Sequence, residues 1–122
     1  MVNLLFFITT AIASDVYEVC RHEKQLWNER AQRYDTKYVS TFYSREKVQF
    51  IIHNNSFEVN RDIRNIQQKF TQDGMNCWRE HENSFVCYDE THNNLLWEFY
   101  KKNGDVTRDV MSVCIKNGEP ID

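Results

Sequence analysis

The first third of the chain has a helical spacing of hydrophobic positions. Apolar and aromatic residues recur at helical intervals over residues 15–43, separated by the polar runs HEKQ, NERAQR and DTK, and this spacing is typical of amphipathic helices. Asp35 or Thr36 is suited to cap a second helix, because short polar side chains accept hydrogen bonds from the free N–H groups of a first turn. The pattern predicts a long helix over residues 16–34 and a short one over 36–43.

In the next segment the hydrophobic positions recur with a period of two. Val48, Phe50 and Ile52 alternate with polar neighbours, although Ile51 interrupts the alternation. This pattern predicts a strand over residues 48–53 with one buried face.

The next segment returns to helical spacing. Asn60 is a natural N-cap for residues 61–70, in which the apolar positions Ile63, Ile66 and Phe70 share one face of a helix. Gly74 is placed to end that helix.

The remaining chain reads as an antiparallel meander. Four strands are expected, over residues 75–80, 84–90, 95–102 and 105–115. The dipeptide Asn103-Gly104 between the last two is a strong hairpin signal, because both residue types accept a positive φ. The expected fold class is therefore α+β, with helices packed on a bent antiparallel sheet.

The N-terminus has the pattern of a secretory signal. Residues 4–13 form an uncharged apolar run too short to span a bilayer, and AIA before Ser14 fits a signal-peptidase site. We expect residues 1–13 to be a signal peptide and residues 14–122 to form one domain that is secreted and, after cleavage, has no membrane segment.

Charge excludes some classes of partner. The chain has 15 basic and 18 acidic residues, a net charge of −3, without a block of either sign. A nucleic-acid-binding stripe or a polybasic membrane patch is not expected.

Four cysteines in a short exported chain indicate two disulfides, for which three pairings are possible. Cys77 and Cys87 are equidistant from Glu82, so a hairpin centred there places them opposite each other. A metal or redox role would need closer cysteine spacing, so we expect a structural disulfide and no metal site. Cys20 and Cys114 then pair by elimination.

The expected order of elements resembles a known family. The stretch YVSTFYSREKVQFIIHNNSFEVNRDIRNIQQKF at residues 38–70 has a helix ending in Phe-Tyr, a strand and a capped helix ending in Phe. This order is similar to the nuclear transport factor 2-like fold, also called the SnoaL or ketosteroid-isomerase-like fold. The resemblance implies a cone whose mouth admits ligands or partners.

For an isomerase or cyclase, the resemblance to the ketosteroid isomerases implies a carboxylate base near the first strand, and the corresponding strand here has no Asp or Glu. His53 is the remaining candidate for the base, with Tyr34 or Tyr38 as the stabilising hydroxyl. A core role for the tyrosines and a surface turn for His53 are the simpler interpretation. We therefore expect no catalytic residue and no cofactor, with a secreted enzyme as the alternative.

A second fold remains open. Secreted ribonuclease-like effectors are small and joined from an N-terminal to a C-terminal cysteine, as Cys20 and Cys114 would be. Such a protein would here be without catalytic activity, because the REHE sequence falls in a predicted turn.

Aromatic residues mark the expected binding region. Trp97 and Phe99 alternate with Glu98 and point to one side of their strand, whereas Tyr88 and Tyr100 are assigned to an outer face suited to a homodimer. Ligand-lining residues are expected to be Tyr34, Tyr38, Phe50, Trp97 and Phe99.

One modification site is readable. Asn54 begins an N-glycosylation sequon, Asn-Asn-Ser, in a predicted surface turn. Together these features predict a secreted glycoprotein that acts as a non-enzymatic binding or interaction module for a small apolar molecule or a protein partner.

Overall fold

The structure is a computed structural model that describes residues 14–41 and 48–121. The described residues contain eleven β-strands and no helix. No segment among them forms a helix of the length and hydropathy needed to cross a membrane. The expected signal peptide at residues 1–13 lies outside the described part of the chain.

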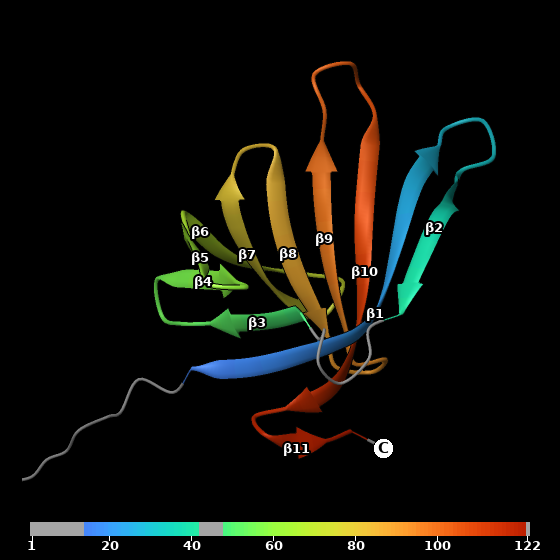
Figure 1. Cartoon of the computed structure of the whole chain (residues 1–122). Helices are drawn as coiled ribbons and strands as arrows, with labels where there is room; N and C mark the ends of the chain where they lie inside the picture. Colours follow the sequence, from blue (N-terminus) through green and yellow to red (C-terminus); the bar gives the residue numbers. More distant parts are fainter. Residues whose placement is uncertain (1–13, 42–47, 122) are drawn as a thin grey trace, which may run out of the picture.

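All strands belong to one antiparallel sheet (Figure 1). Their bounds are β1 (Asp15–Asn28), β2 (Arg33–Thr41), β3 (Val48–Ile52), β4 (Ser56–Val59), β5 (Asp62–Asn65), β6 (Gln68–Gln72), β7 (Met75–His81), β8 (Ser84–Asp89), β9 (Asn94–Tyr100), β10 (Val106–Lys116) and β11 (Glu119–Pro120). The spatial order is β5-β4-β3-β1-β10-β9-β8-β7-β6, with β2 added to β1 and β11 added to β10.

The two ends of this order are joined by the chain itself. Only Ile66 and Gln67 separate β5 from β6. The Ile66 N–H donates to the Asn55 carbonyl beside β4, and the Gln67 N–H donates to the Arg79 carbonyl on β7. The linker therefore connects the two end strands of the sheet, which curls around its inner face.

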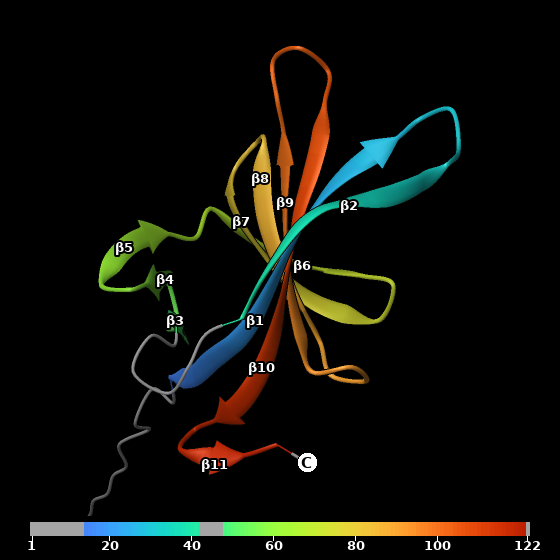
Figure 2. The ribbon, with the colours of Figure 1, turned by 45° about the vertical axis from the view of Figure 1, so that its right-hand side comes forward.

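Strand β1 organises the sheet because it has three partners. Its first part pairs with β3 and its second part with β2 along the same edge, while β10 pairs along the other edge. Figure 2 shows β1 crossing the molecule, with β2 following its far half as a hairpin arm.

The inner face of the curled sheet carries the main core. Eleven buried side chains form it: Tyr17, Val19, Phe50, Ile52, Phe57, Val86, Tyr88, Leu95, Trp97, Met111 and Val113. The ring of Phe50 stacks on Phe57 at 5.3 Å, and Trp97 meets both rings edge-on. These arrangements suit the aromatic quadrupole and add to the burial of apolar area.

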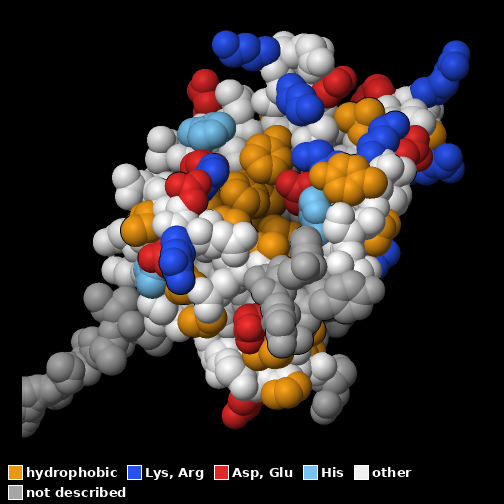
Figure 3. All heavy atoms as spheres, in the orientation of Figure 1, with side chains coloured by type: hydrophobic (Ala, Val, Ile, Leu, Met, Phe, Trp, Pro, Cys, Tyr) orange, Lys and Arg blue, Asp and Glu red, His pale blue; other side chains and the backbone are white. Residues whose placement is uncertain are grey.

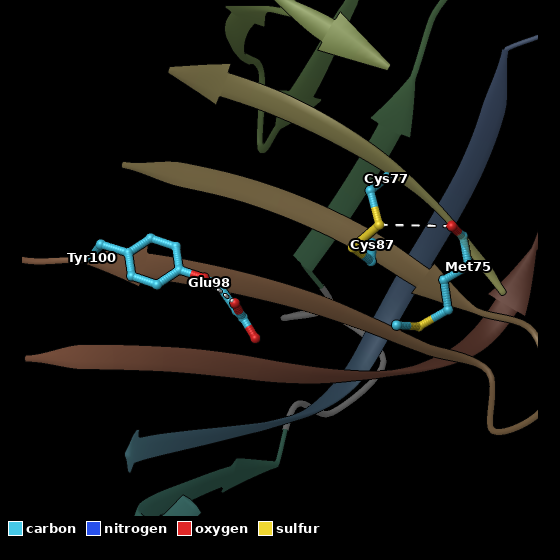
Figure 4. The surroundings of a disulfide bond; sticks show 5 residues. All are labelled: Met75, Cys77, Cys87, Glu98 and Tyr100. Atoms are coloured by element: carbon cyan, nitrogen blue, oxygen red, sulfur yellow. Dashed lines mark hydrogen bonds between the residues drawn. A yellow bond between two sulfur atoms is a disulfide. The ribbon is translucent and has the colours of Figure 1, made fainter. Parts of the chain in front are cut away.

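A smaller cluster lies on the outer face of β6, β7 and β8. It consists of Cys77, Phe85 and Cys87, with Phe70 and Met75 packed against them. Cys77 is directly opposite Cys87 with 4.0 Å between their Cα atoms, and the two are bonded (Figure 4). Both expected disulfides are present, since Cys20 is also bonded to Cys114.

The α+β expectation is wrong. No helix packs on the sheet in the described residues, so neither the cone-shaped nuclear transport factor 2-like fold nor the ribonuclease-like alternative describes this chain. The order of elements that carried the resemblance is replaced by a succession of strands.

The first expected helix, over residues 16–34, forms β1 and its turn into β2. The register of β1 against β10 shifts on both sides of Val19. Before the shift Tyr17 and Val19 face inward, and after it His22 and Leu26 do, because they are paired with Met111 and Thr107. Inward positions 19, 22 and 26 therefore imitate helical spacing inside a bulged strand.

The second and third expected helices fail for other reasons. The segment 36–43 falls largely in β2, where Tyr38 and Val39 are exposed and pack in no core. Asn60 begins a turn instead of a helix: Asn60 and Arg61 have φ values of 49° and 74°, which close a two-residue hairpin between β4 and β5. Ile63, which was expected on the buried face of that helix, lies on β5 and is 63% exposed.

The expected strands over residues 48–53 and after residue 74 are confirmed, whereas the expected two-residue turn at Asn103-Gly104 is wrong. The expected strand over 48–53 is β3, and the four expected strands of the meander are β7, β8, β9 and β10. The connection containing Asn103 and Gly104 is longer than a two-residue turn, because Tyr100 pairs with Val106 across five intervening residues.

Candidate functional site in the concave face

The inner face of the sheet contains a hollow of about 240 Å³ above the core. Its lining comes from β1, β3, β4, the β4–β5 turn, β9 and β10: Val19, His22, Val48, Val59, Asn60, Trp97, Asp109 and Met111. Figure 3 shows apolar side chains gathered in the middle of one face, with acidic, basic and histidine side chains around them.

Trp97 is held rigidly in this hollow. Its indole N–H donates to the Ser84 hydroxyl at 2.9 Å, and Phe99 stacks on its ring at 5.1 Å. The Arg64 guanidinium lies 5.3 Å from the ring centroid and is itself fixed by Glu80 at 2.7 Å. An aromatic wall held from three sides needs little further ordering when a ligand packs against it.

One wall of the hollow is polar. The Nε2 atom of His22 lies 2.8 Å from Asp109 Oδ1, and Lys24 Nζ lies 3.3 Å from the same oxygen. The His22 and Asp109 side chains are 20% and 16% exposed. Lys24 also lies 5.4 Å from the centroid of the Phe99 ring, which positions its ammonium at the edge of the aromatic surface.

The structure brings only part of the expected ligand set to the hollow. Trp97 lines it, Phe50 lies beneath Trp97, and Phe99 stacks behind it. Tyr38 contributes indirectly, because its ring meets the His22 ring edge-on at 5.7 Å.

Tyr34 belongs to the opposite face of the sheet. Its hydroxyl donates to Glu98, and Arg108 lies 3.8 Å from its ring centroid. Burial and the nearby Glu98 carboxylate raise the pKa of Tyr34 to about 12. Tyr100 also donates to Glu98 (Figure 4), and burial, followed by that hydrogen bond, raises its pKa to about 12.

The proposed outer pair of tyrosines is separated. Tyr88 is buried on the inner face, where its ring lies 4.8 Å from that of Tyr17, whereas Tyr100 is 41% exposed on the outer face. The interpretation of Tyr88 as a surface residue is wrong, because β8 is buried on both faces.

His53 does not line the hollow. Its Nδ1 lies 2.6 Å from the Ser14 hydroxyl and its Nε2 lies 3.3 Å from Glu58. Asn54 is exposed in the turn between β3 and β4, where its side-chain oxygen accepts a hydrogen bond from Lys69. Within the described ranges, no group of three or more His, Cys, Asp or Glu residues is placed to hold a metal ion.

The polar wall was missed in the sequence because its members are far apart. His22 and Asp109 are separated by 87 residues. No family model, curated protein or solved structure matches this chain. Function is therefore inferred from the geometry of the hollow.

Proposed function

We propose that the protein is a secreted, non-enzymatic binding module whose concave hollow takes a small apolar molecule. The observation that carries this proposal is the hollow itself, with five apolar residues among the eight that line it. An engineered cavity of about 150 Å³ lined by apolar side chains binds benzene. By that scale, a hollow of about 240 Å³ accommodates roughly ten non-hydrogen atoms.

The polar pair in the hollow favours recognition over chemistry. A histidine held by a carboxylate is half of a nucleophilic or general-base arrangement, and the other half is a nucleophile within hydrogen-bond reach. Among the described residues, those that line the hollow include no serine, threonine or cysteine. His22 and Asp109 are hydrogen-bonded to each other. Their positions are therefore fixed, which suits them to orient the polar group of a ligand.

Secretion is supported by the two disulfides. Such bonds persist in oxidising compartments and are rare in the cytosol. The exposed sequon at Asn54 is consistent with passage through a eukaryotic secretory pathway. A protein partner is a less specific alternative, because the large exposed apolar side chains lie on separate strands: Tyr38 and Val39 on β2, Ile63 on β5 and Tyr100 on β9.

The test fills the hollow. Val59→Trp adds about seven non-hydrogen atoms to a space sized for about ten, and we expect it to abolish binding of ethylbenzene, followed by isothermal titration calorimetry. Val39→Trp is the matched control, because Val39 is 46% exposed on β2 and lies outside the hollow. Thermal unfolding of both variants establishes that they are folded.

The proposal predicts ethylbenzene binding by the unmodified protein and by Val39→Trp. Binding that survives in a folded Val59→Trp variant places the ligand elsewhere. Absence of binding in the unmodified protein, for ethylbenzene and for its hydroxyl, carboxylate and ammonium analogues alike, refutes the proposed function.

A further inference from the structure

The geometry of the His22–Asp109 pair assigns a role to each ring nitrogen of His22. An ionised carboxylate can only accept hydrogen bonds, so the proton between Nε2 and Oδ1 belongs to His22. In a neutral ring the other nitrogen, Nδ1, then carries a lone pair and is an acceptor. With a neutral ring, Nδ1 of His22 is one acceptor on the polar wall.

The carboxylate offers a second acceptor. Both His22 and Lys24 approach Oδ1 of Asp109, and none of the described residues donates a hydrogen bond to Oδ2. An ionised carboxylate has about four acceptor sites, so Asp109 retains capacity for a donor from a ligand. Asn60 differs, because its side-chain oxygen accepts from the Gln49 N–H at 3.0 Å and its amide N–H groups remain as donors.

The charges of Asp109 and Lys24 on the polar wall cancel each other. Asp109 carries one negative charge and Lys24, 3.3 Å away, carries one positive charge. Arg64, beside Trp97, is paired with Glu80 at 2.7 Å, and its second carboxylate partner, Asp62, is 65% exposed to solvent. An ammonium group on the ligand would meet the Lys24 ammonium, and a carboxylate would meet Asp109. Either would also lose hydration on entering an apolar hollow, at a substantial cost in free energy.

We infer that the hollow selects an uncharged molecule with one hydroxyl group, a small alcohol or phenol of roughly ten non-hydrogen atoms. The hydroxyl donates to Asp109, and its apolar body packs against Trp97 and Met111. A hydroxyl also accepts, which suits the amide of Asn60 on another wall. This inference rests on the proposed function, because it names the chemical class of ligand for the same hollow.

The test compares ligands that share an ethylphenyl body and differ in their polar group. Ethylbenzene, 4-ethylphenol, 4-ethylbenzoate and 4-ethylbenzylammonium are titrated into the full chain by calorimetry at neutral pH. We expect 4-ethylphenol to bind about tenfold more tightly than ethylbenzene, since a hydrogen bond to a charged acceptor contributes at least that factor. The two charged analogues are expected to bind more weakly than 4-ethylphenol by a similar factor.

A variant links the preference to one carboxylate. Asp109→Asn keeps the shape of the side chain but removes the charge, so the advantage of 4-ethylphenol over ethylbenzene should fall to less than threefold. Lys24 then loses its ionic partner, and affinity for 4-ethylbenzoate should rise. A merely structural role for Asp109 would not produce this exchange of preferences. Asp105→Asn, in the exposed β9–β10 connection, is the matched control.

The outcomes separate the two proposals. If ethylbenzene and 4-ethylphenol bind equally, or a charged analogue binds best to the unmodified protein, the inference is wrong while the binding function stands. If Asp109→Asn still binds ethylbenzene and keeps the full preference for 4-ethylphenol, Asp109 is not the acceptor and the inference is overturned. If none of the four compounds binds, the proposed function fails and the inference fails with it.

Discussion

The two disulfides enclose loops of very different length, and their contributions to stability should differ accordingly. Cys77 and Cys87 are separated by 10 residues, whereas Cys20 and Cys114 are separated by 94. In the chain-entropy treatment, a cross-link stabilises the fold by restricting the unfolded chain, and the effect grows with the logarithm of loop length. The expected contributions are about 2.7 kcal/mol for the short loop and about 4.7 kcal/mol for the long one.

Replacing both cysteines of a disulfide by alanine would change the free energy of unfolding in two ways, through the lost cross-link and through the lost packing of the sulfur atoms. Cys77 and Cys87 are 1% and 2% exposed, so their replacement by alanine also removes buried atoms. Each buried methylene-sized group contributes about 1 kcal/mol, which would raise the apparent effect of the short-loop cross-link by about 2 kcal/mol and hide the difference. The cross-links must be opened without changing the side chains.

Two double variants allow this measurement. Cys77→Ala/Cys87→Ala keeps the long-loop disulfide alone, and Cys20→Ala/Cys114→Ala keeps the short-loop disulfide alone. Each is unfolded in urea with and without a reductant, and circular dichroism gives the free energy of unfolding in both states. The difference between oxidised and reduced forms isolates one cross-link within one side-chain background.

We expect the long-loop cross-link to contribute about 2 kcal/mol more than the short-loop one. Equal contributions, or a larger one from Cys77–Cys87, would refute the entropic reasoning. That result would show that the short cross-link acts on the folded state, by holding β7 and β8 in register.

Two further predictions concern the outer face and the surface. Tyr34 and Tyr100 both have folded-state pKa values of about 12, above the unfolded value of about 10, so their contribution to stability is complete below pH 10 and is lost as the pH rises through 12. Glu98→Gln should move tyrosinate formation, followed by ultraviolet absorbance, to lower pH, and an unchanged titration would leave burial as the sole cause. Expression in a eukaryotic secretory host should attach a glycan that Asn54→Gln removes and Asn55→Gln retains; intact mass with and without a deglycosidase measures this, and an unmodified native chain contradicts it.

The second half of the fold could be predicted from local signals. Strands β7 to β10 are runs rich in apolar residues separated by polar turns, and the symmetry of Cys77 and Cys87 about Glu82 identified their pairing. The first half could not be predicted in this way. Asn60 is equally suited to cap a helix and to adopt a positive φ, and only pairing between β4 and β5 decides between the two.

The residues of the candidate site could be predicted only where the pattern within a single strand shows which face they occupy. Side chains alternate between the two faces of a strand, so Trp97 and Phe99 on β9 point to the face opposite that of the charged Glu98. The inward orientation of Trp97 follows from this alternation. His22 and Asp109 meet because β1 pairs with β10 in one particular register. That register depends on contacts between the two ends of the chain, and neither residue has a distinctive sequence neighbourhood.

The bulge in β1 explains both the failed helix prediction and the polar wall. Tyr17 and Val19 face inward, so an unbroken strand would direct Arg21 and Glu23 inward as well. The register shifts around Val19 reverse this alternation, and His22 faces Met111 instead. Bulges often redirect a side chain near a functional site. Cys20 lies within this irregularity and is bonded to Cys114, so the cross-link that ties the chain ends together also lies beside the feature that turns His22 and Lys24 toward Asp109.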